Sequence, residues 1–150
     1  MKIIVDTNII FSAVLNSSSR IGKILINSNK YFDLYTCNFL KTEILKNQEK
    51  IQSLTGLSET ETDELVLLVT KNIKFINEKL ISIETLSITE KLLKDIDPGD
   101  IPFVALAKQL KCKLWTGDKK LIKGLKIKGF TDTITTAELS NLLNNLEVKL

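Results

Sequence analysis

Short apolar runs alternate along the chain with segments whose apolar residues recur at helical spacing. The first run, residues 2–5, is followed directly by Asp6, which predicts a buried strand that ends at a carboxylate. The clearest helical stripe extends from Phe103 to Leu110, with apolar residues at positions i, i+3, i+4 and i+7. Strands and helices that alternate in this way predict a parallel sheet with helices on both faces.

The same pattern places elements along the whole chain. Strands are predicted at residues 2–5, 32–36, near 75–76, 113–116 and 133–135. Helices are predicted at residues 8–15, 21–29, 38–50, 61–72, 85–95 and 136–146, and after the turn at 97–100. The segment 121–125 is expected as a short helix or a turn, and 81–83 is ambiguous. We therefore expect an α/β fold with three layers, α/β/α, around a central, mainly parallel sheet of about four to five strands. Residues 1–150 read as a single domain.

Acidic residues occupy similar places in this predicted frame, beside strand ends and helix starts. They are Asp6 after the first strand, Glu43 early in a predicted helix, Asp100 at a predicted helix start, and Asp118 after a later strand. The carboxyl edge of an open α/β sheet is where ligands bind. The chain has no histidine and only two distant cysteines, which argues against a zinc site and against histidine-based catalysis.

Carboxylate oxygens are the ligands that Mg²⁺ and Mn²⁺ prefer, so the acids predict a hard-metal site. If the protein hydrolyses a phosphodiester, water activated by a metal ion has to supply the nucleophile. Each acid also has a structural interpretation. Asp6 and Asp100 could cap helices, Glu43 could be a solvated helix residue, and Asp97 and Asp118 could belong to turns.

Charge and composition narrow the class of partner. The net charge is +3, but eight lysines and a single acid lie between residues 108 and 128. A cationic surface beside an acidic pocket suits a polyanion such as RNA, and a solvated helix face is the open alternative. Cys37 and Cys112 are expected as buried thiols of a reducing compartment. No apolar run reaches the roughly 18–20 residues that span a bilayer, so we expect a cytoplasmic protein without membrane contact.

Four short segments, taken in order, resemble those of PIN-domain nucleases, in particular the toxins of bacterial toxin–antitoxin pairs. They are residues 3–10 with Asp6-Thr7-Asn8, residues 42–44 around Glu43, residues 97–107 with two acids and an alanine-rich helix, and residues 114–121 with Thr116-Gly117-Asp118. The resemblance covers essentially the whole chain. It implies an Mg²⁺- or Mn²⁺-dependent endoribonuclease for single-stranded RNA, often a homodimer, that an antitoxin protein inhibits.

The resemblance also implies roles for individual residues. The metal would be held by Asp6, Glu43, Asp100 and Asp118. Pro102 follows the acidic turn closely and could shift Asp100, which leaves Asp97 as an alternate ligand. Asn8 and Thr116 would orient ligands or phosphate. Independently of the family, the lysines of 108–128, Lys119 and Lys120 among them, are expected to contact the RNA backbone.

Other families fit less well. A haloacid dehalogenase-type phosphatase needs a second aspartate two residues after the first, where this chain has Asn8. A Rossmann domain needs a glycine-rich first turn, and a P-loop needs lysine after its last glycine; neither motif is present. The alternative that stays open is a non-catalytic PIN-like protein that binds RNA or a protein partner.

Overall fold

A five-stranded parallel sheet forms the centre of the protein, in a computed structural model that describes residues 1–148. The strand order is β3-β2-β1-β4-β5, and all four neighbouring pairs are parallel. The strands are β1 (Lys2–Val5), β2 (Asp33–Cys37), β3 (Ile73–Ile76), β4 (Lys113–Trp115) and β5 (Thr133–Ile134). The predicted parallel sheet is confirmed.

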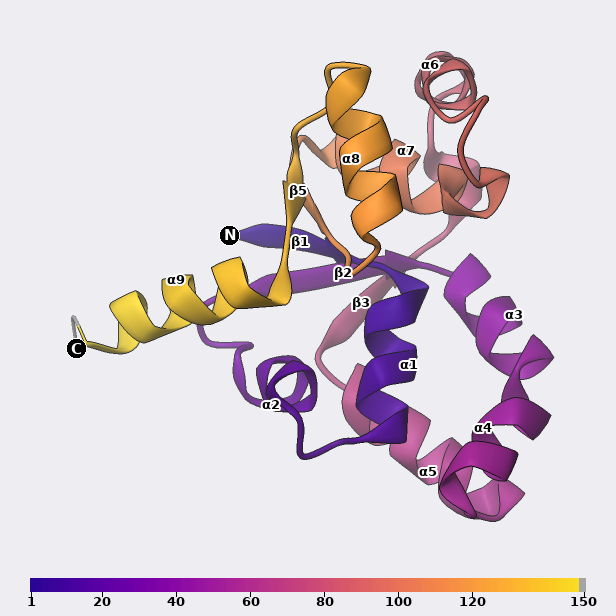
Figure 1. Ribbon diagram of the computed structural model, residues 1–150, viewed down its shortest axis with the longest axis vertical. Coiled ribbons are helices and arrows are strands. Elements are labelled where there is room, and N and C mark those ends of the chain that lie inside the picture. The colour runs from indigo at the N-terminus through magenta and orange to yellow at the C-terminus, as the bar shows by residue number, and fades with distance from the viewer. Residues whose placement is uncertain (149–150) are drawn as a thin grey trace.

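Helices cover both faces of this sheet, as Figure 1 shows with the sheet nearly edge-on. On one side lie α1 (Thr7–Leu15), α2 (Arg20–Asn27) and α5 (Glu59–Thr70), with α3 (Phe39–Lys46) and α4 (Gln48–Thr55) at one end of this layer and α9 (Thr136–Val148) at the opposite end. On the other lie α6 (Ile83–Leu92), α7 (Ile101–Leu110) and α8 (Lys119–Ile127). Two short 3-10 turns, η1 (Glu78–Leu80) and η2 (Pro98–Asp100), precede α6 and α7. The three-layer α/β/α prediction is confirmed.

The core is built on β1 and α7. Ile3, Ile4 and Val5 are fully buried because β1 is the central strand and helices cover both of its faces. Residues 103–107 of α7 are also buried, since this helix packs on β1, β2 and β4. Pro102 stands in the first turn of α7, where a missing N–H costs no hydrogen bond. This packing fixes the position of the segment that precedes α7.

The predicted helix at residues 38–50 is two helices, α3 and α4, that meet at Asn47. The Asn47 side-chain amide donates a hydrogen bond of 2.8 Å to the Glu43 backbone carbonyl. Such a side-chain bond offers the backbone an alternative to a continuous helix. The apolar spacing continues across the break, which is why the sequence pattern does not reveal it.

Two other segments differ from the sequence pattern. The ambiguous residues 81–83 are no strand: Ser82 caps α6 after η1, and its hydroxyl accepts a hydrogen bond from the Thr85 N–H. The segment expected as a turn or short helix at 121–125 is the longer helix α8, which begins at Lys119. In both places a capping side chain defines the helix start better than apolar periodicity does.

Both cysteines are free thiols. Cys37 is fully buried, and burial, followed by the nearby Glu78 carboxylate, raises its pKa to about 12. Cys112 is only half-buried, so the prediction of two buried thiols is correct for Cys37 alone. Within residues 1–148 no single helix is long and apolar enough to cross a membrane. Among these residues, α1 and α2 reach the length and apolar composition of a membrane span only when they are taken together, and the two helices are bent by 109° relative to each other.

Candidate metal centre

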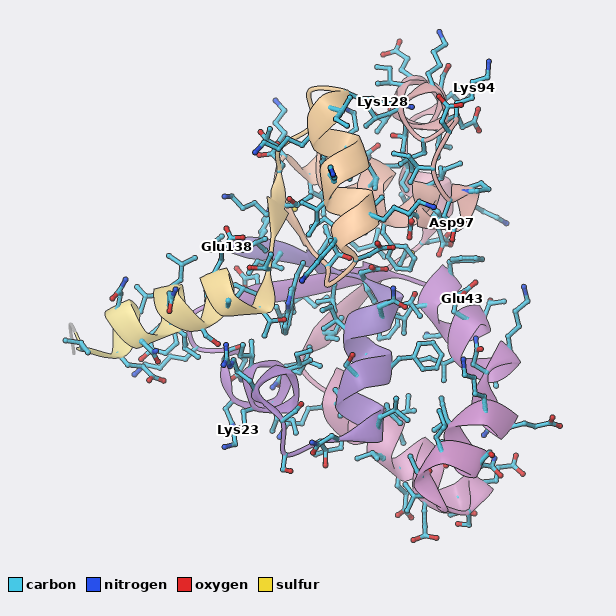
Figure 2. All side chains as sticks on the ribbon, in the orientation of Figure 1. Lys23, Glu43, Lys94, Asp97, Lys128 and Glu138 are labelled. Carbon is cyan, nitrogen blue, oxygen red and sulfur yellow. The ribbon has the colours of Figure 1, made fainter. Side chains whose placement is uncertain are left out.

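A cavity of about 460 Å³ opens at the carboxyl edge of the sheet, beside the ends of β1 and β4. Its walls come from α1, from α3 and α4, and from η2 with the start of α7. All five predicted acidic ligands line it: Asp6, Glu43, Asp97, Asp100 and Asp118. Figure 2 shows Glu43 on α3 and Asp97 near α7 reaching the same edge of the molecule. The fold therefore gathers acids from four separate segments into one cavity.

Asp6 is placed by strand pairing and held by a hydrogen bond from a distant threonine. Its backbone N–H donates to the Trp115 carbonyl at 3.1 Å, which continues the pairing of β1 with β4. The side chain is 2% exposed, and its Oδ2 accepts a 2.8 Å hydrogen bond from the Thr116 hydroxyl, 110 residues away. Asp6 makes no side-chain cap on α1, so the capping interpretation is wrong.

Thr116 joins two of the acidic residues. It is fully buried just after β4, and its hydroxyl oxygen accepts a 3.1 Å hydrogen bond from the Asp118 N–H while it donates to Asp6. Asp118 then caps α8, because its Oδ1 accepts from the Leu121 N–H at 3.1 Å. The cap uses one carboxylate oxygen, so it does not exclude a second role for Asp118.

The acidic turn before α7 contains two carboxylates, of which one makes a capping hydrogen bond and the other does not. Asp97 caps η2, with its Oδ1 accepting a 2.8 Å hydrogen bond from the Gly99 N–H. Asp100 stands at the N-cap position of α7, yet its side chain makes no capping bond. The capping interpretation of Asp100 is therefore wrong, and its half-buried carboxylate remains in the cavity wall.

The acids perturb one another. Burial is the largest cause that raises the pKa of Asp100, to about 7, and the charges of Asp6, Asp97, Asp118 and Glu43 follow. Burial also raises the pKa of Asp6, and the hydrogen bond from Thr116 opposes this. A divalent cation among such carboxylates would offset their repulsion and favour their ionised forms.

The donor set fits a hard cation, although the acids do not form a ready coordination shell. Among residues 1–148, no three Asp, Glu or Cys side chains stand close enough together to hold one ion directly. Mg²⁺ usually keeps several waters and is held by one or two carboxylates, so direct ligation by three acids is not required. The oxygen-only chemistry and the raised pKa of Asp100 support the fit.

The remaining predicted residues lie at different distances from the cavity. Asn8 is exposed at the start of α1 and lines the cavity. Lys119 and Lys120 are exposed at the start of α8 and are not among the described residues that line it.

Sequence reasoning missed three polar residues of the wall: Thr7, Asn47 and Lys50. Thr7 Oγ1 is buried without a hydrogen-bond partner in the part of the chain that the structure describes. Asn47 and Lys50 stand four and seven residues after Glu43. This helical spacing could have indicated that they share a face with Glu43.

The fold and the cavity define an α/β protein with a carboxylate-lined site at the edge of a parallel sheet. A family model described as a PIN domain matches residues 4–144, and the chain belongs to this family. No curated protein matches the chain.

Among solved structures, the crystal structure of VapBC2 from Rickettsia felis bound to a DNA fragment from their promoter is similar, with a TM-score of 0.68. The match covers 90% of this chain and 97% of that chain at 14% identity, which shows a shared fold.

Proposed function

We propose that this protein is a metal-dependent endoribonuclease that hydrolyses single-stranded RNA and is the toxin of a bacterial toxin–antitoxin pair. The observation that carries the proposal is the convergence of five carboxylates on one cavity, with the pKa of Asp100 raised to about 7. Membership of the PIN domain family supports nuclease activity. The likeness to VapBC2, a complex bound to promoter DNA, supports an antitoxin protein as the partner.

In this proposal Asp6, Glu43, Asp100 and Asp118 would hold Mg²⁺ or Mn²⁺, one or two of them directly and the others through its waters, with Asp97 as an alternate ligand. A bound cation would lower the pKa of the attacking water and would offset the negative charge of the phosphate. Thr116 orients Asp6 through the 2.8 Å hydrogen bond, which also opposes the rise that burial causes in the pKa of Asp6. Asn8, exposed at the start of α1, contacts the phosphate from the cavity wall.

The proposal extends to the wider surface and to the assembly. Lys119 and Lys120 bind the RNA backbone next to the cavity, which is supported by their position directly after Asp118. Residues 1–150 act as a single domain, which the one sheet and one hydrophobic core found in residues 1–148 support. We further propose a cytoplasmic homodimer, on the resemblance to the toxin family.

Substitution of Asp6 by asparagine tests the metal-dependent reaction. The protein is incubated with synthetic single-stranded RNA in Mg²⁺, in Mn²⁺ and in a chelator. We expect cleavage with either metal, none in the chelator, and a loss of at least ~100-fold in kcat/KM for Asp6→Asn, or about 2.7 kcal/mol. Asp33→Asn, at an exposed position that begins β2, is the matched control and should keep full activity.

The alternative is a non-catalytic PIN-like protein that binds RNA or a protein partner. If neither Asp6→Asn nor the unsubstituted protein cleaves, yet both bind RNA equally, this alternative is correct. Cleavage that persists in the chelator, or that is unchanged in Asp6→Asn, rules out the metal-dependent reaction.

A further inference from the structure

The carboxylates occupy only one end of the cavity, which continues as a groove between α1 and the helices α3 and α4. One wall comes from residues 7, 8, 11 and 15 of α1, and the other from residue 43 of α3, the junction residue 47, and residues 50, 51 and 54 of α4. The α1 residues have the spacing of one helix face, and so do residues 50, 51 and 54 within α4. Figure 1 shows α1 facing α3 and α4 along their lengths. The groove therefore follows α1 from Thr7 to Leu15, roughly 12 Å of helix axis.

The end of the groove away from the acids is apolar. Its lining includes Phe11, Leu15, Ile51 and Leu54. Leu15 is 46% exposed and Leu54 is 62% exposed, whereas Phe11 is half-buried. Single exposed leucines are ordinary on protein surfaces, but here two of them share a concave wall with an aromatic ring. This combination indicates a binding surface for a flat apolar group.

A lysine side chain lies between the acidic and the apolar ends of the groove. Lys50 is exposed on α4 and lines the cavity. The ion pair found among residues 1–148 joins Lys128 to Asp95, so no acid within 4 Å neutralises Lys50. An unpaired ammonium group beside a row of carboxylates suits a phosphate that follows the one bound at the acids.

We propose that the apolar end of this groove is a subsite for one unpaired nucleobase, next to the phosphodiester that the carboxylates hold. The inference rests on the proposed endoribonuclease function. A phosphodiester that reaches Asp6 and Asp100 brings its neighbouring bases with it, and the groove is continuous with that position. The base stacks on Phe11 and contacts Leu54, and Lys50 contacts the adjoining phosphate.

This subsite makes the enzyme selective for single strands. In a duplex the bases are stacked and paired, so that they cannot enter a groove between two protein helices. An unpaired base can leave the stack and lie against an aromatic side chain, which strengthens binding by roughly 5- to 150-fold per base. The same contact tolerates different bases, since every base has a π-face.

Abasic substrates test the subsite without any change to the protein. The cleaved bond of a single-stranded RNA is mapped first, with Mn²⁺ present. Substrates are then made with an abasic nucleotide on either side of that bond, and with one four nucleotides away as a control. We expect kcat/KM to fall roughly 5- to 150-fold for the abasic site on one side of the bond, and to stay unchanged for the distant one.

Protein variants connect that loss to the groove. In Phe11→Ala and in Leu54→Ala, the ratio of kcat/KM for the intact substrate to kcat/KM for the abasic substrate should fall close to one. Leu54 is exposed, so its variant should fold even if the variant at half-buried Phe11 does not. Leu67→Ala is the matched control, because Leu67 is 69% exposed on the neighbouring helix α5 and should keep the full ratio.

Equal cleavage of intact and abasic substrates overturns the subsite, and so does an undiminished ratio in Leu54→Ala. Either result would favour a peptide segment of a protein partner as the occupant of the groove. If no RNA is cleaved at all, the endoribonuclease proposal fails by itself. Fluorescence anisotropy with an intact octanucleotide and a fully abasic one then decides the subsite: tighter binding of the intact strand that Leu54→Ala removes supports it, and equal binding overturns it.

Discussion

The hydroxyl of Thr116 connects the ends of two strands that are distant in the sequence. It donates to Asp6 at 2.8 Å and accepts from the Asp118 N–H at 3.1 Å. The bond to Asp6 opposes the effect of burial on the pKa of that carboxyl. Thr116 is therefore a positioning residue, which acts through the acids that we propose as metal ligands.

At the residue scale, removal of this hydroxyl should change how activity depends on pH. In Thr116→Val the pKa of Asp6 rises further, so less of the carboxylate is ionised near neutrality. We expect kcat/KM at pH 7 to fall about 10-fold and the acidic limb of the pH–rate profile to move to higher pH. Thr116→Ser keeps the donor and should retain the original profile. Superimposable profiles for all three proteins would contradict this role.

Single residues also show what sequence reasoning could reach. Asp6, Asp100 and Asp118 were expected at one sheet edge, and they line one cavity. The hydrogen bond between Asp6 and Thr116 could not be predicted, because it depends on how β1 and β4 pair. Lys50 was missed, although the helix predicted at residues 38–50 already places it seven residues after Glu43.

At the element scale, helix α8 presents a basic surface next to the cavity. Asp118 caps the helix, and Lys119 and Lys120 follow it on the exposed side. Two lysines that contact phosphates of a single strand release bound counterions and so make affinity depend on salt. The position of α8 thus gives the predicted lysine surface a definite place beside the acids.

Substitution of both lysines should weaken the salt dependence of RNA binding. For Lys119→Ala with Lys120→Ala, the slope of log K against log salt should become shallower by about 1.4, at ~0.7 per phosphate contact. The measurement is fluorescence anisotropy at several salt concentrations in a chelator. A control pair, Lys91→Ala with Lys94→Ala, lies on and after α6, where Figure 2 shows Lys94 at the far end of the molecule. Equal slopes for both pairs would remove α8 from the RNA-binding surface.

The strands and most helices were predictable because their patterns are strong. A buried run such as residues 3–5 and a full stripe such as residues 103–110 leave little choice of element. The break between α3 and α4 and the start of α8 were not predicted. Both depend on single side chains, Asn47 and Asp118, that bond to nearby backbone groups.

At the scale of the whole molecule, the acidic cavity should make the metal-free protein less stable as the pH rises. The pKa of Asp100 is about 7 in the folded protein, above its ordinary value of 3.8. The folded state therefore binds the proton more tightly than the unfolded state. The resulting stability is fully present below about pH 4 and is lost as the pH rises through about 7. Because Asp100 is only half-buried, the effect should be on the order of 1–2 kcal/mol.

Urea unfolding in a chelator at pH 5 and pH 8 measures this effect. Asp100→Asn removes the titrating group, so its free energy of unfolding should fall less between the two pH values than that of the unsubstituted protein. At pH 8 the variant should be more stable by on the order of 1–2 kcal/mol, although it has lost activity. A variant that is less stable than the unsubstituted protein at pH 8 would contradict the view that burial and the neighbouring acids destabilise the ionised Asp100 carboxylate.

A divalent cation should reverse this instability. A ligand that binds only the folded state stabilises it by about 2.7 kcal/mol at a concentration 100 times its Kd. We therefore expect Mn²⁺ to raise Tm by several degrees, with a clearly smaller rise for Asp100→Asn and no reduction for Asp33→Asn. Differential scanning fluorimetry at pH 8 is the measurement. An identical rise in all three proteins would place the bound metal elsewhere.

The central place of the first strand has a consequence for synthesis on the ribosome. β1 is made first, but one of its two neighbours is β4, which is followed by Thr116 and Asp118. A nascent chain that has not yet released these residues lacks part of the cavity and leaves one side of β1 unpaired. If the protein cuts RNA as proposed, cutting can begin only after the segment that contains Thr116 and Asp118 has left the ribosome and β4 has paired with β1.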